Sequence, residues 1–175
     1  MGDKKLAVIV LGHKNSGKSH TWYELFGRVI RSGYKRLNLG YKQINPVVKN
    51  SSFEETDQEI EDYIDPFVQN SSFEENGGEI ENWFDEDGLP DIFFCSVQYS
   101  THGIQTINWL KEKGYYLYIQ WLNPGYHDKE EYADSLDFEN KFQNSGQFER
   151  YTGKEKIDRT IRLKKFLTDW VTNNR

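Results

Sequence analysis

The sequence predicts an α/β fold with a mostly parallel sheet of about four to five strands. Apolar runs typical of buried strands recur at 6–11, 91–97 and 115–122, and stretches with helical spacing of apolar residues follow or separate them. Strands that alternate with helices favour parallel pairing through crossover connections. The length of 175 residues fits one domain, which we expect to span 1–175.

The first half of the chain begins with the most apolar run. Residues 6–11 (LAVIVL) predict a strand that is buried on both faces, as in a parallel sheet. Residues 17–31 predict a helix, because Trp22, Leu25, Phe26 and Val29 recur at helical spacing and Gly33 follows as a stop. Residues 34–39 (YKRLNL) predict a second, shorter strand.

The second half repeats the alternation. Residues 91–97 predict a third strand, 101–113 a helix that ends at Gly114, and 115–122 a fourth strand that ends at Asn123-Pro124-Gly125. We expect a charged helix from 128 to about 142. Residues 154–171 predict an amphipathic terminal helix, because apolar side chains recur there every three or four residues.

An acidic insertion over 45–90 separates the second and third strands. It contains a tandem repeat, in which 50–65 and 70–85 share ten of sixteen residues. Each copy begins with a capping-box pattern, Ser51 before Glu54 and Ser71 before Glu74. We expect a helical insertion with solvated acidic faces. It could also cover a substrate or dock a basic partner.

The charges are divided unevenly along the chain. The net charge is −6, but residues 50–110 hold fifteen acidic residues and no Lys or Arg, which leaves a basic surplus of nine elsewhere. The acidic part argues against a broad nucleic-acid interface, and the basic remainder could hold the phosphates of a small ligand. A single cysteine, the lack of a leader-like start and the lack of a long apolar run predict a cytoplasmic protein that does not enter a membrane.

The loop after the first strand carries the strongest functional signal. Residues 12–19 (GHKNSGKS) match the pattern G-x-x-x-x-G-K-[ST] in full, between a buried strand and an amphipathic helix. Glycines let such a loop curl so that its N–H groups surround phosphates, and the next helix directs its N-terminus at them. We expect Lys18 to contact the β- and γ-phosphates and Ser19 to bind Mg²⁺.

These residues resemble the Walker A loop of the P-loop NTPase superfamily. The resemblance implies a three-layer α/β fold, a nucleoside triphosphate (ATP or GTP) and Mg²⁺. The implied nucleotide-binding residues are Gly12, His13, Lys14, Asn15, Ser16, Gly17, Lys18, Ser19 and His20.

The rest of a catalytic site is less complete. P-loop enzymes usually place an acidic Mg²⁺ partner at a second strand end, yet the predicted third and fourth strands end in Gln98 and Asn123 without a carboxylate. Gln98 could act through water, or the acid could come from the acidic insertion, or be absent. The guanine-reading pattern N-K-x-D is not found, which favours ATP.

The region from 121 onward is weakly similar to the lid segments of nucleoside and small-molecule kinases. In those enzymes arginines neutralise the transferring phosphate, which makes Arg150, Arg159 and Arg162 candidates here, with Lys18 as a further catalytic residue. The four histidines are scattered and Cys95 has no partner cysteine, so a zinc site is not expected.

Three functions remain open at this point. The first is phosphoryl transfer from ATP to a small acceptor, for which the acidic insertion favours a neutral or cationic molecule. The second is an NTPase switch whose repeat docks a protein partner. The third is a module that binds nucleotide without turnover. We lean towards an enzyme, and no partner is expected to be a nucleic acid.

Overall fold

The fold was analysed in a computed structural model, which describes residues 4–43, 59–84 and 88–174. The strands are β1 (Leu6–Gly12), β2 (Gly33–Tyr34), β3 (Leu37–Gln43), β4 (Glu59–Ile64), β5 (Phe67–Gln69), β6 (Ile92–Gln98), β7 (Tyr116–Leu122) and β8 (Gly146–Tyr151). The helices are α1 (Lys18–Phe26), α2 (Thr101–Glu112), α3 (Phe138–Phe142) and α4 (Lys156–Asn174), with a 3₁₀ turn η1 (Ile80–Asn82).

Six strands form the main sheet in the order β2-β5-β6-β1-β7-β8. Strands β5, β6, β1, β7 and β8 run parallel, and only the short β2 is antiparallel, to β5. The expected α/β fold with a mostly parallel sheet is confirmed. The sheet has one strand more than the four to five that we expected, because the edge strands β2 and β8 and the short strand β5 carry no long apolar run.

The chain leaves β1 to build one side of the sheet and later returns to build the other. Strands β5 and β6 lie on one side of β1, and β7 and β8 lie on the other. In open α/β sheets ligands bind at the carboxyl ends of the strands where the winding reverses in this way. Here that point is the end of β1, which is followed by the loop from Gly12 to Lys18.

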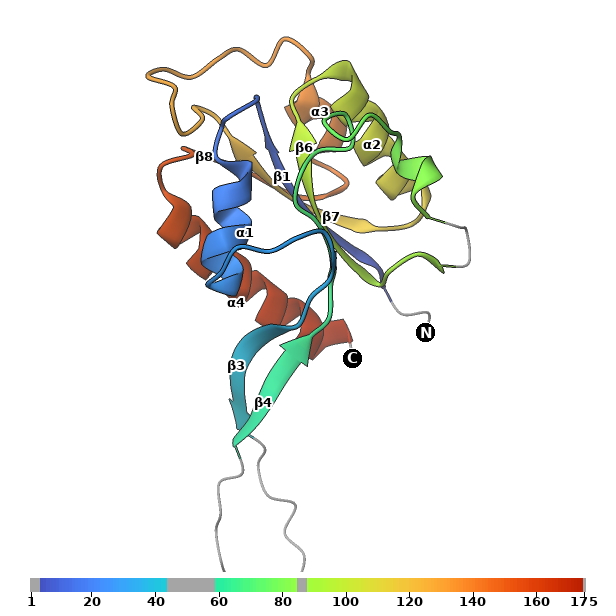
Figure 1. Cartoon of the computed structure of the whole chain (residues 1–175), viewed down its shortest axis with the longest axis vertical. Helices are drawn as coiled ribbons and strands as arrows, with labels where there is room; N and C mark the ends of the chain where they lie inside the picture. Colours follow the sequence, from blue (N-terminus) through green and yellow to red (C-terminus); the bar gives the residue numbers. More distant parts are fainter. Residues whose placement is uncertain (1–3, 44–58, 85–87, 175) are drawn as a thin grey trace, which may run out of the picture.

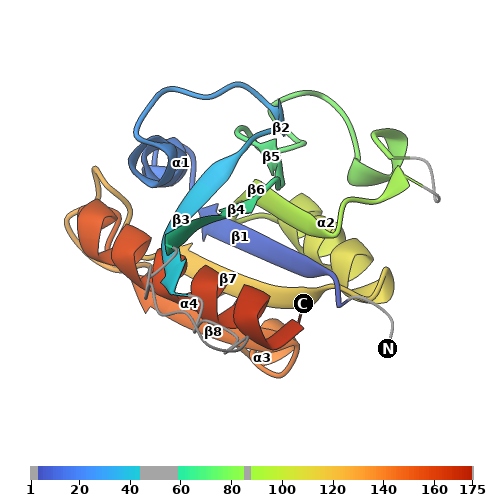
Figure 2. The same cartoon turned by 90° about the horizontal axis from the view of Figure 1, so that it is seen from below.

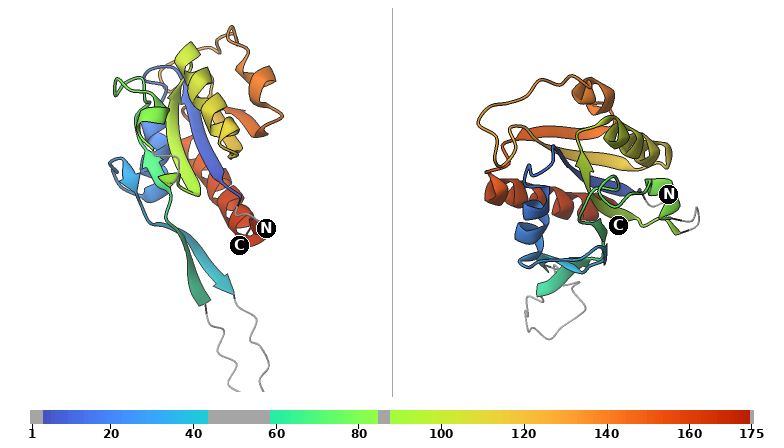
Figure 3. Two further views of the ribbon diagram at one scale, coloured as in Figure 1. Left: turned by 90° about the vertical axis from the view of Figure 1, so that its right-hand side faces the viewer. Right: turned by 45° about the horizontal axis from the view of Figure 1, so that its top comes forward.

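Helices cover both faces of the main sheet (Figures 1 and 3). Side chains of β1 alternate between two cores: Ala7, Ile9 and Leu11 pack with residues of α2 and α3, and Leu6, Val8 and Val10 pack with residues of α1 and α4. All seven residues of β1 are buried, as the apolar run predicts. The long helix α4 lies beside α1, as the view from below also shows (Figure 2).

The expected helical insertion is wrong for the part of it that the structure describes. Residues Glu59–Ile64 form β4, which pairs antiparallel with β3 in a separate two-stranded sheet, and Phe67–Gln69 form β5 in the main sheet. Figure 1 shows the β3–β4 hairpin extending from the body of the protein. In the described part of the second copy, 70–84, the only helical element is the 3₁₀ turn η1, and Gly77 adopts the left-handed φ of +69°, which would interrupt an α-helix. Residues 50–58 lie outside the described part.

Two other expected helices are shorter than the apolar spacing suggests. Helix α1 ends at Phe26, because Gly27 takes a left-handed conformation and closes it, so Val29 is exposed rather than packed. The charged helix expected over 128–142 is confined to Phe138–Phe142. Within the described residues, no helix is both long and apolar enough to cross a membrane.

Candidate functional site

The loop between β1 and α1 is a tight curl. Asn15 and Gly17 have left-handed φ values of +60° and +94°, and the Ser16 N–H donates to the His13 carbonyl at 3.2 Å. A side chain at Gly12 would place its Cβ 2.3 Å from Ser16 Oγ. The two glycines are therefore required by this loop conformation, as the sequence pattern indicates.

Lys18 directs its ammonium back over the loop. Its Nζ donates to the carbonyls of Gly12, at 3.1 Å, and His13, at 2.7 Å, and the side chain is only 7% exposed. A lysine ammonium has three protons, so one donor is left over. Burial lowers the pKa of Lys18, while the charges of Glu75 and Glu74 oppose this. Among the described residues no carboxylate lies within ion-pair distance of Nζ.

The N-terminus of α1 has the features of an anion site. Gly17 supplies no side-chain cap, and the first turn contains no acidic residue. The unpaired N–H groups of a first helical turn carry a partial positive charge. Ser16 Oγ and His20 Nδ1 nearby are buried without a hydrogen-bond partner, whereas the neighbouring Ser19 is exposed.

These features fit a polyphosphate with a bound Mg²⁺. The lysine has a spare donor, and Ser19 presents an exposed hydroxyl, which is a suitable oxygen ligand for Mg²⁺. Within the described ranges no cluster of three or more His, Cys, Asp or Glu side chains could hold a metal. Mg²⁺ on phosphates needs only one or two protein ligands, so the two observations agree.

Three neighbouring strand ends fix the loop in place. Just after β6, the Tyr99 N–H donates to the Gly12 carbonyl at 3.0 Å, and after β7 the Tyr126 N–H donates to the Ser16 carbonyl at 2.8 Å. After β8, a Cβ on Gly153 would lie 2.4 Å from the Ser16 carbonyl oxygen. The loop is thus held by hydrogen bonds and close packing from both sides of β1.

His13 lies against aromatic rings rather than in solvent. Its ring centroid is 3.9 Å from that of Tyr132 and 5.1 Å from that of Tyr99. Burial lowers the pKa of His13, Asp128 opposes the shift and Lys18 adds to it. The side chain is therefore neutral at pH 7, while its neighbours Lys14 and Asn15 are exposed at the tip of the loop.

An acidic segment from the second repeat copy reaches the same end of the sheet. The 2.8 Å hydrogen bond from Ser96 Oγ to the Asn70 carbonyl holds the chain beside β6. Further along, Ser100 Oγ donates to Glu74 at 3.1 Å. The carboxylates of Glu74 and Glu75 are exposed there, and their negative charges raise the pKa of Lys18 against the effect of burial. Sequence reasoning allowed for an acid from the insertion but identified no residue.

The arginines suggested by the weak kinase resemblance do not face the loop together. Arg150, on β8, bonds to Glu131 at 3.4 Å and Glu139 at 3.1 Å, and its guanidinium lies 4.5 Å from the centroid of Trp121. Arg162 is exposed on α4, with its guanidinium 6.0 Å from the centroid of Tyr151.

Arg159 is enclosed in the protein. It is 0% exposed, and its guanidinium donates to Thr21 Oγ1 at 2.6 Å and to the Gly153 carbonyl at 3.4 Å. Burial lowers its pKa to about 10, against the opposing charges of Glu155 and Tyr151. Its contacts join α4 to the helix and the turn that flank the loop, which is a structural arrangement.

Gln98, which the sequence offered as one alternative for a group acting through water, is the last residue of β6 and lies opposite Gly12 in register. The sequence therefore placed it correctly at a strand end next to the loop. No sequence pattern indicated Tyr126 and Gly153. They belong to turns after β7 and β8, and only the order of strands in the sheet brings them to the loop.

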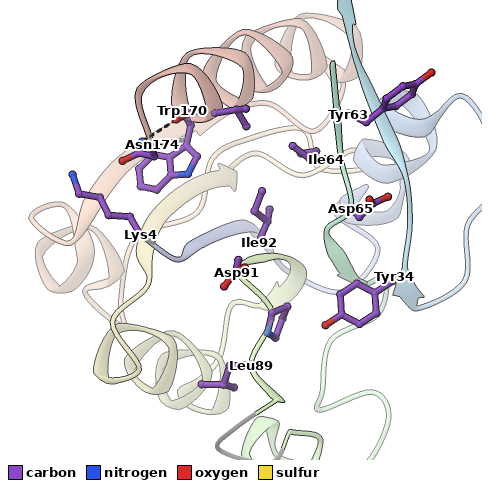
Figure 4. Close-up of a pocket in the computed structure, with 12 residues that line it drawn as sticks. Lys4, Tyr34, Tyr63, Ile64, Asp65, Leu89, Asp91, Ile92, Trp170 and Asn174 are labelled. Atoms are coloured by element: carbon purple, nitrogen blue, oxygen red, sulfur yellow. Dashed lines mark hydrogen bonds between the residues drawn. The ribbon is translucent and has the colours of Figure 1, made fainter. Parts of the chain in front are cut away.

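A separate hollow of about 500 Å³ lies at the other end of the sheet (Figure 4). Its walls include Tyr34, Asp91 and Trp170, near the starts of β5 and β6 and the end of α4. The seven residues of β1 separate it from the loop, a length of about 20 Å at the usual rise of a strand. None of the residues that line it belongs to the loop from Gly12 to Lys18.

The chain matched no protein-family model, no curated protein and no solved structure in the comparisons made. The assignment of function therefore depends on the residues and geometry described above.

Proposed function

We propose that the protein binds a nucleoside triphosphate, preferably ATP, as a P-loop protein, and transfers a phosphoryl group to a small acceptor in the presence of Mg²⁺. The single observation that supports this most strongly is Lys18, a buried ammonium that is held over a glycine curl by two carbonyls and has one donor left over. It lies beside an uncapped helix N-terminus at the point where the sheet winding reverses.

Each part of the loop has a distinct role in this proposal. The backbone N–H groups of the curl and of the first turn of α1 surround the phosphates, and Lys18 contacts the β- and γ-phosphates. Ser19 would hold Mg²⁺, which when bound neutralises charge on the phosphate oxygens. The bonds from Tyr99 and Tyr126 keep these donors in position before the ligand arrives.

The acceptor is argued from charge. The acidic segment that reaches the loop includes Glu74 and Glu75, and no Lys or Arg occurs anywhere in 50–110. An anionic acceptor would be repelled there, so a neutral or cationic molecule is favoured. The absence of the N-K-x-D pattern favours ATP over GTP.

The test is equilibrium binding of ATP and GTP, with Mg²⁺ and with EDTA, to the wild type, to Lys18→Ala and to the control Lys14→Ala. Losing charge-assisted hydrogen bonds worth about 1.5–3 kcal/mol should weaken ATP binding by about 10- to 150-fold in Lys18→Ala. Lys14 lies in the same loop but is exposed, so its loss should change affinity only a few-fold. Equal affinity in wild type and Lys18→Ala would refute the proposal.

A second candidate is an NTPase switch or a non-hydrolysing module that docks a protein through the acidic repeat. It is favoured by the ends of β6 and β7, which carry Gln98 and Leu122 and no carboxylate. Phosphate release from ATP without any acceptor would support the switch. Tight binding with neither release nor transfer to any of a panel of neutral and cationic acceptors would support the module.

A further inference from the structure

We propose that Arg159 is a positioning residue for the triphosphate, and that its buried guanidinium supplies a positive charge just behind the loop which a bound polyphosphate balances. The guanidinium does this without touching the ligand, through the electrostatic field and through its contacts with α1 and the turn at Gly153. The inference depends on the proposed function, because the triphosphate provides the negative charge. It gives a role to a buried cation that the fold itself leaves without a counter-charge.

Arg159, on α4, has no negatively charged partner in contact with it. It is 0% exposed, its two terminal nitrogens donate to the neutral oxygens of Thr21 and Gly153, and its Nε has no hydrogen-bond partner. Among the described residues no carboxylate forms an ion pair with it. Glu155 acts on this charge only from an exposed position, where water and salt screen it. Since buried charges in proteins are normally paired, this arrangement favours a negative charge that comes from a ligand.

The contacts of Arg159 place it directly behind the loop. Its Nη1 donates at 2.6 Å to Thr21, which lies in the early part of α1. Its Nη2 donates at 3.4 Å to the Gly153 carbonyl, whose oxygen lies 3.6 Å from the position that a Cβ on Gly17 would take. Gly17 is the N-cap residue of α1. Only one carbonyl group therefore separates the guanidinium from the start of the helix that would receive the phosphates.

The guanidinium lies near the positive end of α1. The free N–H groups of a first helical turn carry a partial positive charge, and a cation beside them is unfavourable on its own. The ammonium of Lys18 adds a second full charge, and the first turn holds no acidic residue that would offset it. Three positive groups thus converge at one place. A polyphosphate at the N-terminus of α1 would relieve the repulsion among all of them.

Buried polar atoms on the loop side independently indicate a ligand at the same place. Ser16 is only 2% exposed, and its Oγ has no hydrogen-bond partner. His20 Nδ1 is also buried without a partner, and it lies 3.7 Å from the position that a Cβ on Gly17 would take. Polar atoms that are buried this completely are normally hydrogen-bonded. The residues on both sides of Gly17 therefore leave polar groups unsatisfied next to the charge of Arg159.

The experiment compares the affinities for ATP and for ADP, both measured in EDTA, of the wild type and four variants. Arg159→Met and Arg159→Gln remove the charge, and the glutamine keeps a hydrogen-bond donor for its neighbours. Arg159→Lys keeps the charge in a different shape. The control Lys165→Met removes one positive charge from an exposed position on the same helix. The thermal midpoint of each variant verifies folding, and either neutral variant is sufficient if the other does not fold.

We expect both neutral variants to bind ATP about 5- to 20-fold more weakly than the wild type. The size follows from Coulomb's law, because a unit charge about 12 Å away changes an affinity about tenfold at an effective dielectric constant of about 20. The loss should be smaller for ADP, which carries one negative charge fewer. Arg159→Lys should stay within about threefold of the wild type and Lys165→Met within about twofold. A purely structural role predicts instead equal losses for ATP and ADP and no rescue by lysine.

The inference and the proposed function fail differently. If the wild type binds ATP in a Lys18-dependent way and a folded neutral variant binds it equally well, the inference alone is overturned. The same holds if Arg159→Lys binds ATP as weakly as the neutral variants, or if ATP and ADP lose affinity equally. If the wild type binds no triphosphate in Mg²⁺ or in EDTA, both are overturned.

Discussion

The buried guanidinium of Arg159 permits a prediction whose size can be worked out from the structure. The side chain is 0% exposed and bonds only to neutral oxygens, Thr21 Oγ1 and the Gly153 carbonyl, while its Nε has no partner. Burial lowers its pKa from 12.5 to about 10. This difference corresponds to about 3 kcal/mol that opposes the buried cation.

Replacing Arg159 with methionine removes both the cost and the bonds. The cost of about 3 kcal/mol disappears, while two hydrogen bonds from a charged donor, each worth about 1.5–3 kcal/mol, are lost. The two bonds together are worth about 3–6 kcal/mol, so Arg159→Met should lower the free energy of unfolding by between zero and about 3 kcal/mol. Arg159→Ala loses the same bonds and leaves a cavity, so it should be about 2–4 kcal/mol less stable than the methionine variant.

Urea unfolding of the three proteins, followed by tryptophan fluorescence, measures these differences, because Trp22 and Trp121 are fully buried. A loss above about 4 kcal/mol in Arg159→Met would refute the reasoning, since the charge would then stabilise the fold on balance. If instead the methionine variant is stable but binds ATP as poorly as Lys18→Ala, Arg159 acts on the nucleotide, as the weak kinase resemblance suggests.

Three further predictions concern groups around the loop. Burial raises the pKa of Asp134, but hydrogen bonds from Tyr99 and two backbone N–H groups of α3 outweigh it, so the net pKa lies below its ordinary 3.8. The contribution of the Asp134 carboxylate to the free energy of unfolding should be complete above about pH 4 and lost as the pH falls through the folded pKa. Asp134→Asn should therefore lower the free energy of unfolding by about 1–3 kcal/mol at neutral pH and flatten the acid limb of a curve of stability against pH. Gly153→Ala should lower the free energy of unfolding by about 1–3 kcal/mol, and with it the thermal midpoint, because its Cβ would meet the Ser16 carbonyl oxygen at 2.4 Å. An unchanged midpoint would show that the turn can move aside. Burial lowers the pKa of His13 from 6.5, so its contribution to stability is complete above pH 6.5 and lost as the pH falls through the folded value, and an NMR titration that gives 6.5 or more would contradict this.

The elements that sequence analysis predicted correctly are those whose local pattern agrees with their packing. Strands β1, β6 and β7 are continuous apolar runs that are buried in the centre of the sheet, and α2 and α4 show the helical spacing of apolar residues. Strand β8 was not predicted, because an edge strand with the sequence GQFERY has no such run and its residues are only partly buried.

The tandem repeat shows why local sequence was not sufficient. Glu59-Ile60-Glu61 and Glu79-Ile80-Glu81 have the same sequence, yet the first begins strand β4 and the second belongs to a 3₁₀ turn. The first copy pairs with β3, whereas the second follows Gly77-Gly78 and packs Ile80 into the core near α2. Tertiary contacts, which differ between the copies, decide the conformation.

The site was predictable to the extent that it is contiguous in the chain. The pattern from Gly12 to Ser19 predicts a loop at the end of a strand, and the structure has one there. The partners of that loop come from residues 99, 126 and 153, which no spacing rule connects. Only the order of strands in the sheet brings them together.

The bonds from the Tyr99 and Tyr126 N–H groups to the carbonyls of Gly12 and Ser16 have a thermodynamic consequence. The conformational entropy of the curl is already lost when the chain folds, so little of it remains to be lost when an anion enters. If the loop binds a polyphosphate as proposed, the affinity should be governed by the release of water and ions from the ligand. The affinity should therefore respond more to ionic strength than to the stiffness of the surrounding chain.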